Sequence, residues 1–377
     1  MIGSLFTYNL LKLLLAVTLL ICGKTISKTK NKRAIFVSAI IAIAVFSLIE
    51  GLRWDRGPDY YNNYLLLTTN DLNVKKSEPF FNTIIDTLKM LSIPYWGCFI
   101  FFSFLYIYSF TKIVKVFPKA AMWALPVMFL ISVDAHENLI RQFIAISFLL
   151  FAYYCYISNQ KALMLLCLLA VFNIHLSGLF AVALLFLFIL LKPEKIIKSP
   201  LLLTGIYLVL YFFWDTVYLS GITSILEKIN LGTDNMQGYL DNADRWFTDE
   251  GSLSYLQGAK VSTSLIKHLF TLITNSTIIY YGFQTIKYDQ RLRIPYWFTF
   301  TAILLFVLGG DIEIYRRLAW WLYCFMPIIL GAIWYLVPIK PKIKITLMSI
   351  IAFSYAYSFI MNLTTVPYSG FAFVWDR

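Results

Sequence analysis

The sequence predicts an all-α, polytopic integral membrane protein. Of its 377 residues, 59% are hydrophobic and 14% are charged, whereas soluble domains carry about a quarter charged residues. Apolar stretches long enough to cross a hydrocarbon core of ~30 Å recur along the whole chain. The polar stretches between them leave no room for a large water-exposed domain, so we expect a single membrane-embedded domain over residues 1–377.

About twelve transmembrane helices account for the apolar stretches. The predicted spans cover residues 3–22, 34–50, 95–112, 119–133, 139–157, 162–174, 176–191, 200–219, 262–283, 294–310, 317–337 and 345–362. We expect the first to be a span rather than a signal peptide, because it lacks a basic leading segment and lysines follow it instead of a cleavage site. The spans 119–133 and 162–174 are short, and we expect them to be tilted or broken.

Basic residues mark alternate connecting loops. They gather in the ranges 24–33, 112–119, 161, 192–198, 287–293 and 340–344. Only Glu194 and Asp289 are acidic there. Because cytoplasmic loops collect Lys and Arg, these loops are predicted to face the cytoplasm and both termini to lie outside. The net charge of +12 therefore indicates membrane orientation rather than nucleic-acid binding.

The predicted spans contain almost no charge, with Lys12 as the clearest exception. Pumps and ion-coupled carriers usually need a polar relay near the membrane midplane, so this pattern disfavours both. All histidines and the acid–base clusters fall at or near the predicted outer face. Any chemistry is therefore expected at the outer membrane boundary.

Two predicted outer segments are longer than simple turns. Segment 51–94 has apolar residues at helical spacing from Phe80 to Leu91, which favours a helix lying at the membrane interface. Segment 220–261 is polar and glycine-containing, and it is predicted to be a loop or lid. The cysteines all lie in or at the end of apolar stretches, and we interpret them as core residues.

The densest candidate cluster follows the second span. It contains Arg53, Trp54, Asp55, Arg56, Asp59, Tyr60 and Tyr61. Arginines bind phosphate through forked hydrogen bonds, carboxylates can orient or deprotonate a hydroxyl, and aromatic rings offer flat faces to sugars. The alternative is an interfacial belt of aromatic anchors and mutually neutralising charges.

A second cluster contains His136, Glu137 and Arg141, with Arg141 about one turn inside the fifth span. A buried arginine at this place can clamp a diphosphate. The alternative is a local ion pair, because Glu137 lies four residues before Arg141 on the same helix face.

Two further sites complete the candidates. His175 lies in the turn between the sixth and seventh spans with Asn173 and Ser177, where a neutral imidazole can act as a general base near pH 7. The alternative is a hydrogen-bonded structural histidine. Arg316 and Arg317 precede an aromatic helix and suit phosphate recognition, or else act as snorkelling anchors. No nucleotide fingerprint, Walker loop, serine elbow or metal-binding spacing is present in the sequence.

Four short motifs lie in order along the chain. They are Gly57-Pro58-Asp59-Tyr60-Tyr61 with Tyr64, Arg141-Gln142-Phe143-Ile144-Ala145, Asn173-Ile174-His175-Leu176-Ser177, and Tyr315-Arg316-Arg317 before an aromatic helix with Pro327. As a set they resemble the EpsG-type, Wzy-like polymerases of bacterial exopolysaccharides, capsules and O antigens. The resemblance covers most of the chain but not segment 220–261.

The resemblance implies a GT-C-like, Wzy-like fold in the bacterial cytoplasmic membrane, and glycosyl transfer at its outer face without a metal or other cofactor. A polyprenyl-diphosphate-linked oligosaccharide would donate its reducing end to a hydroxyl of a second lipid-linked repeat unit. The leaving diphosphate would be stabilised by Arg56, Arg141, Arg316 and Arg317. His175 would be the base, with Asp59 second. A flippase and a chain-length regulator of the same pathway are expected partners beside the bilayer.

Three other functions compete with this interpretation. A ligase would move a finished glycan to another lipid or protein by the same chemistry. A flippase or exporter of lipid-linked oligosaccharide would make no bond, and the sparse charge in the spans disfavours it. A membrane-bound acyltransferase would need a histidine facing the cytoplasm, and the lysine-marked loops contain none.

Overall fold

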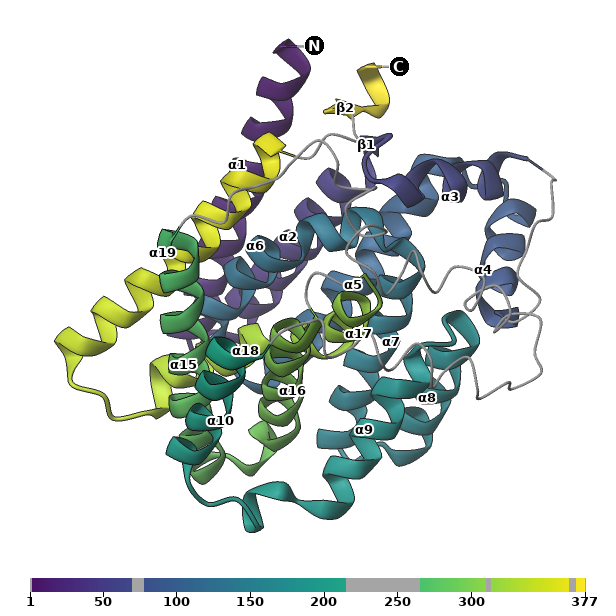
Figure 1. The fold of residues 1–377 in the computed structure, drawn as a ribbon. Coiled ribbons are helices and arrows are strands. Elements are labelled where there is room, and N and C mark those ends of the chain that lie inside the picture. Colours follow the sequence, from purple (N-terminus) through teal and green to yellow (C-terminus); the bar gives the residue numbers. More distant parts are fainter. Residues whose placement is uncertain (1, 70–77, 215–264, 310–312, 366–370, 377) are drawn as a thin grey trace.

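Helices form nearly all of the described chain. The computed structural model describes residues 2–69, 78–214, 265–309, 313–365 and 371–376, and Figure 1 shows a bundle of helices. The first helices are α1 (Ile2–Lys28), α2 (Lys32–Gly51), α3 (Pro58–Thr68), α4 (Pro79–Met90), α5 (Tyr95–Val116), α6 (Ala121–Asn138), α7 (Ile140–Ile157), α8 (Lys161–Ile174), α9 (Gly178–Leu191) and α10 (Pro200–Phe213). The later ones are α15 (Leu265–Tyr288), α16 (Arg293–Gly309), α17 (Glu313–Tyr323), α18 (Met326–Leu336) and α19 (Pro341–Thr365).

Short 3₁₀ turns and two strands join or follow these helices. The turns are η1 (Pro118–Ala120), η2 (Pro193–Lys195), η4 (Gln290–Leu292) and η5 (Val374–Asp376), and the strands are β1 (Arg53–Trp54) and β2 (Ala372–Phe373).

Local sequence signals explain several helix starts. The Asn31 side chain accepts hydrogen bonds from two backbone N–H groups at the start of α2, and Ser199 accepts one at the start of α10. Pro58 and Pro79 stand in the first turns of α3 and α4, where the missing N–H would have no partner within the helix. Helix starts of this kind are therefore set by nearby residues.

Every predicted span corresponds to a helix or to a pair of helices within the described residues, but fewer than twelve qualify as spans. Among the residues that the structure describes, six helices are long and apolar enough to cross a membrane, and a seventh span results if the bent pair α17–α18 is counted as one. The segments Pro118–Val133, Lys161–Ile174 and Pro200–Phe213 are apolar but shorter. The chain is thus a multi-pass helical membrane protein, and both the number twelve and the orientation of the termini remain predictions.

The prediction of one continuous span over 317–337 is wrong. The chain forms α17 and α18 there, and the two helices meet at an angle of 42°. Two residues, Cys324 and Phe325, separate them, and Pro327 follows in the first turn of α18. A proline cannot donate the backbone hydrogen bond that would continue the helix, so the break follows the sequence locally.

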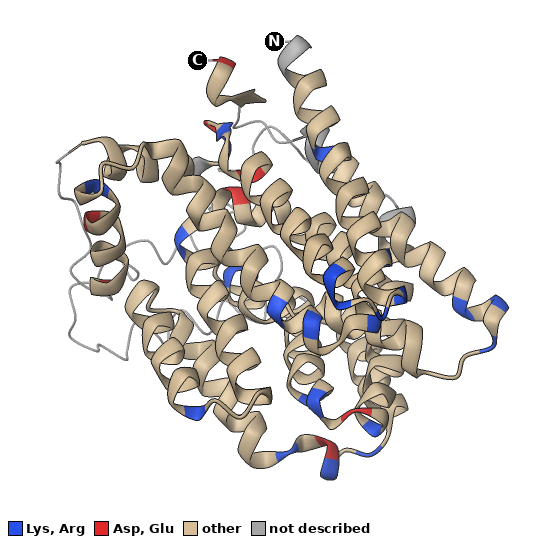
Figure 2. Ribbon diagram, turned by 180° about the vertical axis from the view of Figure 1, so that it is seen from behind, with Lys and Arg blue, Asp and Glu red and all other residues tan. Residues whose placement is uncertain are grey.

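Three of the lysine-marked loops, 112–119, 192–198 and 287–293, contact one another. Arg293 lies with its Nη1 3.7 Å from Glu194 Oε1 and donates from Nη2 to the Tyr156 hydroxyl at 3.3 Å. The Arg291 guanidinium lies 5.2 Å from the ring centre of Phe117. Both termini lie at the opposite end of the bundle, and most basic positions are remote from it (Figures 1 and 2). The charge asymmetry read from the sequence is therefore also a spatial one.

Glycines let α1 and α2 approach their neighbours closely. A Cβ placed on Gly23 would lie 2.4 Å from the carbonyl oxygen of Ala121, and one on Gly51 would lie 2.4 Å from the Cα of Ile100. Such contacts tolerate no larger residue, and small residues are a common means of packing membrane helices. As a result α1 packs against α6, and α2 packs against both α1 and α5.

A short strand pair corrects the purely helical prediction. Strand β1 pairs antiparallel with β2, with Arg53 opposite Phe373 and Trp54 opposite Ala372. The backbone N–H of Val374 also donates to the carbonyl of Leu52 at 2.9 Å. The chain end is thereby attached to the loop that follows α2.

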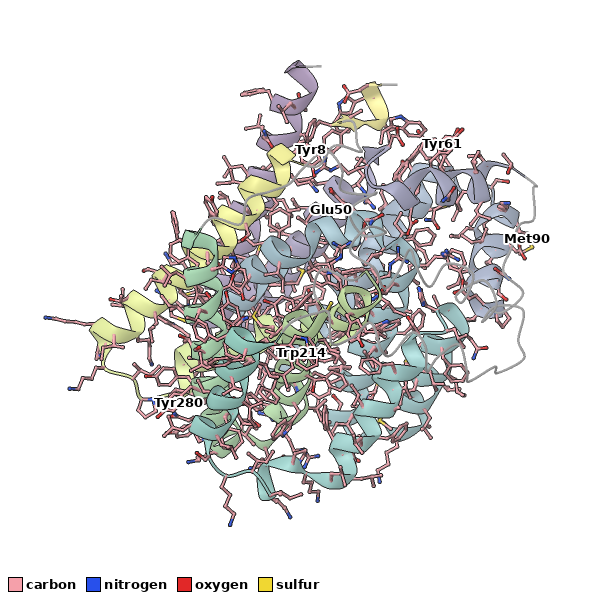
Figure 3. All side chains as sticks on the ribbon, viewed as in Figure 1. Tyr8, Glu50, Tyr61, Met90, Trp214 and Tyr280 are labelled. Atoms are coloured by element: carbon pink, nitrogen blue, oxygen red, sulfur yellow. The ribbon has the colours of Figure 1, made fainter. Side chains whose placement is uncertain are left out.

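The segment 51–94 contains the predicted helix and one more. Helix α4 covers the predicted amphipathic stretch and buries Phe81, Ile85 and Leu88, while α3 precedes it. Figure 3 shows Tyr61 on α3 and Met90 on α4 at the side of the bundle. The predicted loop or lid at 220–261 lies outside the described residues. All five cysteines are buried and unpaired, as expected of core residues.

Candidate active site

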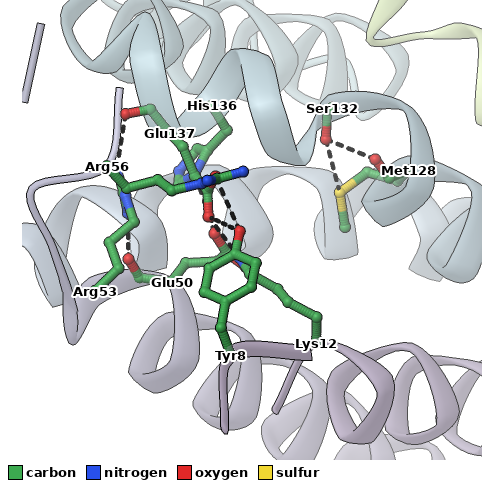
Figure 4. Close-up of polar contacts among 9 residues, drawn as sticks. All are labelled: Tyr8, Lys12, Glu50, Arg53, Arg56, Met128, Ser132, His136 and Glu137. Carbon is green, nitrogen blue, oxygen red and sulfur yellow. Dashed lines mark hydrogen bonds and ion pairs between the residues drawn. The ribbon is translucent and has the colours of Figure 1, made fainter. Parts of the chain in front are cut away.

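Most of the predicted site residues fall into two groups, and Asp55, Asp59, Tyr60 and Tyr61 lie outside both. The first we call the buried charge cluster, which consists of Tyr8, Lys12, Glu50, Arg53, Arg56, His136 and Glu137 (Figure 4). The second we call the arginine–histidine site, which consists of Arg141, His175, Ser177, Arg316, Arg317 and Trp321. Figure 3 shows Tyr8 and Glu50 of the first group towards the end of the bundle that carries both termini.

Glu137 is the centre of the buried charge cluster. Its Oε1 lies 2.6 Å from Lys12 Nζ and accepts a hydrogen bond from the Tyr8 hydroxyl at 2.9 Å. Its Oε2 accepts from Arg56 Nε at 3.0 Å. Lys12 also reaches Glu50 Oε1 at 2.5 Å. The carboxylate thus joins α1, α6 and the loop after α2, and the local Glu137–Arg141 pair considered from the sequence is wrong.

Arg53 is held by backbone carbonyls and aromatic rings. It donates to the carbonyl oxygens of Glu50 and, at 3.2 Å, of Glu137. Its guanidinium lies 5.9 Å from the ring centre of Tyr60, and the Tyr60 hydroxyl donates to the Arg53 carbonyl at 3.0 Å. Burial raises the pKa of Tyr60 above its usual value, so this hydroxyl keeps its proton as a donor.

Burial makes the cluster costly to rearrange. The side chains of Lys12, Glu50, Arg56 and Glu137 are each at most 3% exposed. His136 is also buried, with Nδ1 3.9 Å from Glu50 Oε2. Charges in such surroundings need partners, and here each carboxylate has a cation. These contacts agree with the alternative in which the charges neutralise one another. Substrate binding by Arg53, Arg56, His136 and Glu137 remains a prediction.

Sequence reasoning noticed Lys12 as a charge inside a span but gave it no role. A lysine within a predicted transmembrane helix is a strong signal for a buried partner. Its partner Glu50 is the only acidic residue of the second predicted span, and nothing in the sequence pairs the two positions. Only the packing of α1 against α2 and α6 brings them together.

Asp55, in the loop after α2, and Asp59, on α3, are less enclosed than the buried charge cluster. Asp55 is exposed and has a backbone φ of 48°, a left-handed conformation that Asp adopts more readily than most residues. Asp59 is half-buried in the first turn of α3, and its backbone N–H donates to Asn138 Oδ1 at 3.3 Å. Tyr61 is 54% exposed. Their catalytic and binding roles remain predictions.

Arg141 pairs with a residue that the sequence analysis did not consider. Its Nη1 lies 2.9 Å from Glu78 Oε2, with 30% of the Arg141 side chain exposed. The guanidinium also lies 5.8 Å from the ring centre of Phe81. Glu78 directly precedes α4, at a position where its side chain makes no capping hydrogen bond, so Arg141 links α7 to the start of α4. In contrast to Arg53 and Arg56, Arg141 retains substantial solvent access.

Helix α17 brings the remaining candidates together. Gln142 Nε2 donates to the carbonyl oxygen of Arg317 at 2.7 Å, so the start of α7 with Arg141 lies against the start of α17. Arg316 and Arg317 are half-buried. Four residues beyond Arg317, Trp321 donates from Nε1 to Ser177 Oγ at 3.1 Å. One helix therefore connects the arginine pair with the turn that contains His175.

His175 is half-buried and contacts Ser177 and Trp321. Its Nδ1 lies 2.9 Å from Ser177 Oγ, and its ring centre lies 5.9 Å from that of Trp321 in an edge-to-face arrangement. Within the described part of the chain, no group of three or more His, Cys, Asp or Glu residues is arranged to hold a metal ion. The site contains arginine side chains that can bind an anion and an imidazole that can accept a proton.

Fold and site together define a multi-pass helical membrane protein with arginines and a histidine at helix ends remote from its basic loops. The comparison with family models gives the particular family. The chain belongs to the EpsG family, whose model matches residues 35–373, and this is a family of Wzy-like polysaccharide polymerases. Searches of the curated proteins and of the solved structures found no match to this chain.

Proposed function

We propose that this protein polymerises polyprenyl-diphosphate-linked oligosaccharide repeat units at the outer face of the bacterial cytoplasmic membrane. Membership of the EpsG family supports a polymerase-type role in polysaccharide synthesis. The single structural observation that supports this mechanism is the position of α17. It carries Arg316 and Arg317 next to the start of α7 and, one turn later, contacts the His175 turn through Trp321.

The proposed reaction transfers a glycan without a metal ion. An acceptor hydroxyl attacks the anomeric carbon of the donor, and the bond between that carbon and the diphosphate oxygen breaks. The hydroxyl proton passes to His175, and the bonding electrons leave with the diphosphate. Cations in a site of low dielectric stabilise such a leaving group strongly. We assign this role to Arg141, Arg316 and Arg317.

The loop after α2 and the start of α3 are assigned to the sugars. Asp59 is the second candidate for the base, and Asp55 would orient a sugar hydroxyl from its exposed position. Tyr61, with much of its ring accessible, offers a surface on which a sugar can stack. The buried charge cluster holds the backbone of this loop in place through Arg53 and Arg56. A flippase and a chain-length regulator are the proposed pathway partners.

The test is a reconstituted reaction with the purified full-length protein and lipid-linked repeat units. We expect Arg141→Ala and His175→Ala to lower the polymerisation rate by ~100-fold or more, in the range of a lost general base or charge stabiliser. Arg291→Ala and His268→Ala are matched controls, because Arg291 lies among the basic loops and His268 contacts Tyr211 instead. Both should retain normal rates.

The products decide between related functions. A polymerase yields a ladder of chain lengths, whereas a ligase joins one finished glycan to a different acceptor, and a flippase leaves the repeat units unchanged. Normal ladder formation by both Arg141→Ala and His175→Ala would contradict the assigned site.

A further inference from the structure

Two consecutive hydrogen bonds join Trp321, Ser177 and His175, and we call these three residues the relay. Trp321 Nε1 lies 3.1 Å from Ser177 Oγ, and Ser177 Oγ lies 2.9 Å from His175 Nδ1. An indole nitrogen can only donate, so the Trp321 N–H must occupy a lone pair of the serine oxygen. The Ser177 hydroxyl is thus fixed by a residue 144 positions away in the sequence.

The packing of Trp321 leaves it little freedom. Its side chain is fully buried, and a Cβ added to Gly178 would lie 2.9 Å from Trp321 Cη2. The ring therefore lies directly over the glycine that follows Ser177 in the chain. The edge-to-face contact between the Trp321 and His175 rings adds a second restraint. Both the serine oxygen and the imidazole are held by one rigid indole.

We propose that Ser177 and Trp321 are positioning residues for His175, which set its ring orientation and its protonated nitrogen for glycosyl transfer. This inference rests on the proposed function, in which His175 is the base. In this proposal Nδ1 of His175 carries the proton and donates it to the second lone pair of Ser177 Oγ, 2.9 Å away, which leaves Nε2 unprotonated as the base. The proton of the acceptor hydroxyl then passes to His175 Nε2 as the new glycosidic bond forms.

The position of Trp321 on α17 couples this relay to the arginine pair. Arg317 is one turn before Trp321 on the same helix, and its carbonyl is held by Gln142 next to Arg141. A shift of α17 would therefore move the diphosphate-binding residues and the serine–histidine pair together. Groups that contact the same rigid helix keep their relative orientation, which is a large part of what an enzyme contributes.

The experiment measures kcat and KM for lipid-linked repeat units with Ser177→Ala, Ser177→Thr and Trp321→Phe. We expect Ser177→Ala and Trp321→Phe to lower kcat on the order of tenfold, because a loosely held base loses part of its orientation. KM should stay within about twofold, because the proposed phosphate contacts remain. Ser177→Thr keeps the hydroxyl and should restore most of the kcat.

Two controls separate positioning from folding and from the proposed function. Trp320→Phe removes an indole N–H from the neighbouring position of the same helix and should leave kcat unchanged. Thermal unfolding of each detergent-solubilised variant identifies any loss of kcat that comes from an unstable fold. Trp321→Phe keeps a ring in the same place, so it tests the N–H even if Ser177→Ala disturbs the turn.

The outcomes distinguish a failure of the proposed function from a failure of this inference alone. If His175→Ala polymerises normally, the proposed function loses its base and this inference falls with it. If His175→Ala is inactive while stable Ser177→Ala and Trp321→Phe keep the parental kcat, the relay has no positioning role and only this inference is overturned. A tenfold loss that Ser177→Thr does not repair would also overturn it.

Discussion

The buried charge cluster and the arginine–histidine site use similar residues in opposite ways. In the first, Lys12, Arg53 and Arg56 are enclosed with two carboxylates, and Glu137 alone receives hydrogen bonds or ion pairs from three side chains. In the second, Arg141 has one carboxylate partner and remains 30% exposed. The buried charge cluster, which contains more charges, is therefore less accessible than the arginine–histidine site. Mutual neutralisation favours structure, and partial exposure leaves room for a ligand.

The largest expected effect tests the structural role of the buried charge cluster. Glu137→Ala leaves Lys12 and Arg56 without their shared carboxylate, and removing one partner of a buried ion pair costs about 3–5 kcal/mol. We expect a marked fall in the unfolding temperature of the solubilised protein, measured by a thermal melt. A stable Glu137→Ala protein that cannot polymerise would indicate that the buried charge cluster takes part in the reaction and is not only structural.

An intermediate effect should separate stability from activity at Arg141. Arg141→Ala leaves the mostly buried Glu78 without its cation, which costs about 1–3 kcal/mol. The double variant Arg141→Ala with Glu78→Gln removes that unpaired charge. We expect the double variant to recover most of the lost stability but none of the activity, as measured by thermal melts and by the ladder assay. Recovery of activity would show that Arg141 has only a structural role.

The smallest expected effect concerns the attachment of the chain end. The Arg56 guanidinium lies 4.9 Å from the ring centre of Phe371, and Phe371→Leu removes this cation–π contact at a cost of about 0.5–1 kcal/mol. Polymerisation by the variant should be normal at low temperature. A large loss of activity without a change in melting temperature would indicate that the chain end contributes directly to the substrate site.

The sequence predicted most of the helices but not their breaks or additions. Apolar length, capping residues and first-turn prolines act over a few residues, so α1, α2, α4 to α10, α15, α16 and α19 could be anticipated. The bend between α17 and α18 was missed although Pro327 marks it. The strand pair of β1 with β2 could not be anticipated, because a two-residue strand has no periodicity and its partner lies near the other end of the chain.

The candidate site was predicted residue by residue but not in its grouping. Arg141, His175, Arg316 and Arg317 were identified from charge and motif, whereas Glu78 and the relay through Trp321 were not. The Arg53–Tyr61 cluster is the densest candidate in the sequence, and such a density of charge at a membrane boundary is unusual. The sequence could not show that Arg56 of that cluster would be buried against Glu137.

By itself, the sequence determined that this protein lies in a lipid bilayer and that its basic residues gather in alternate loops. Hydrophobic length and loop charge are properties of short segments. The tertiary structure decided the partners. Lys12 meets Glu137 across 125 positions, and Trp321 meets Ser177 across 144. Lipid-facing helices share the same apolar composition, so their packing is selected by shape at glycines such as Gly23, Gly51 and Gly178. That packing determines which charges are buried together and which remain open to a substrate.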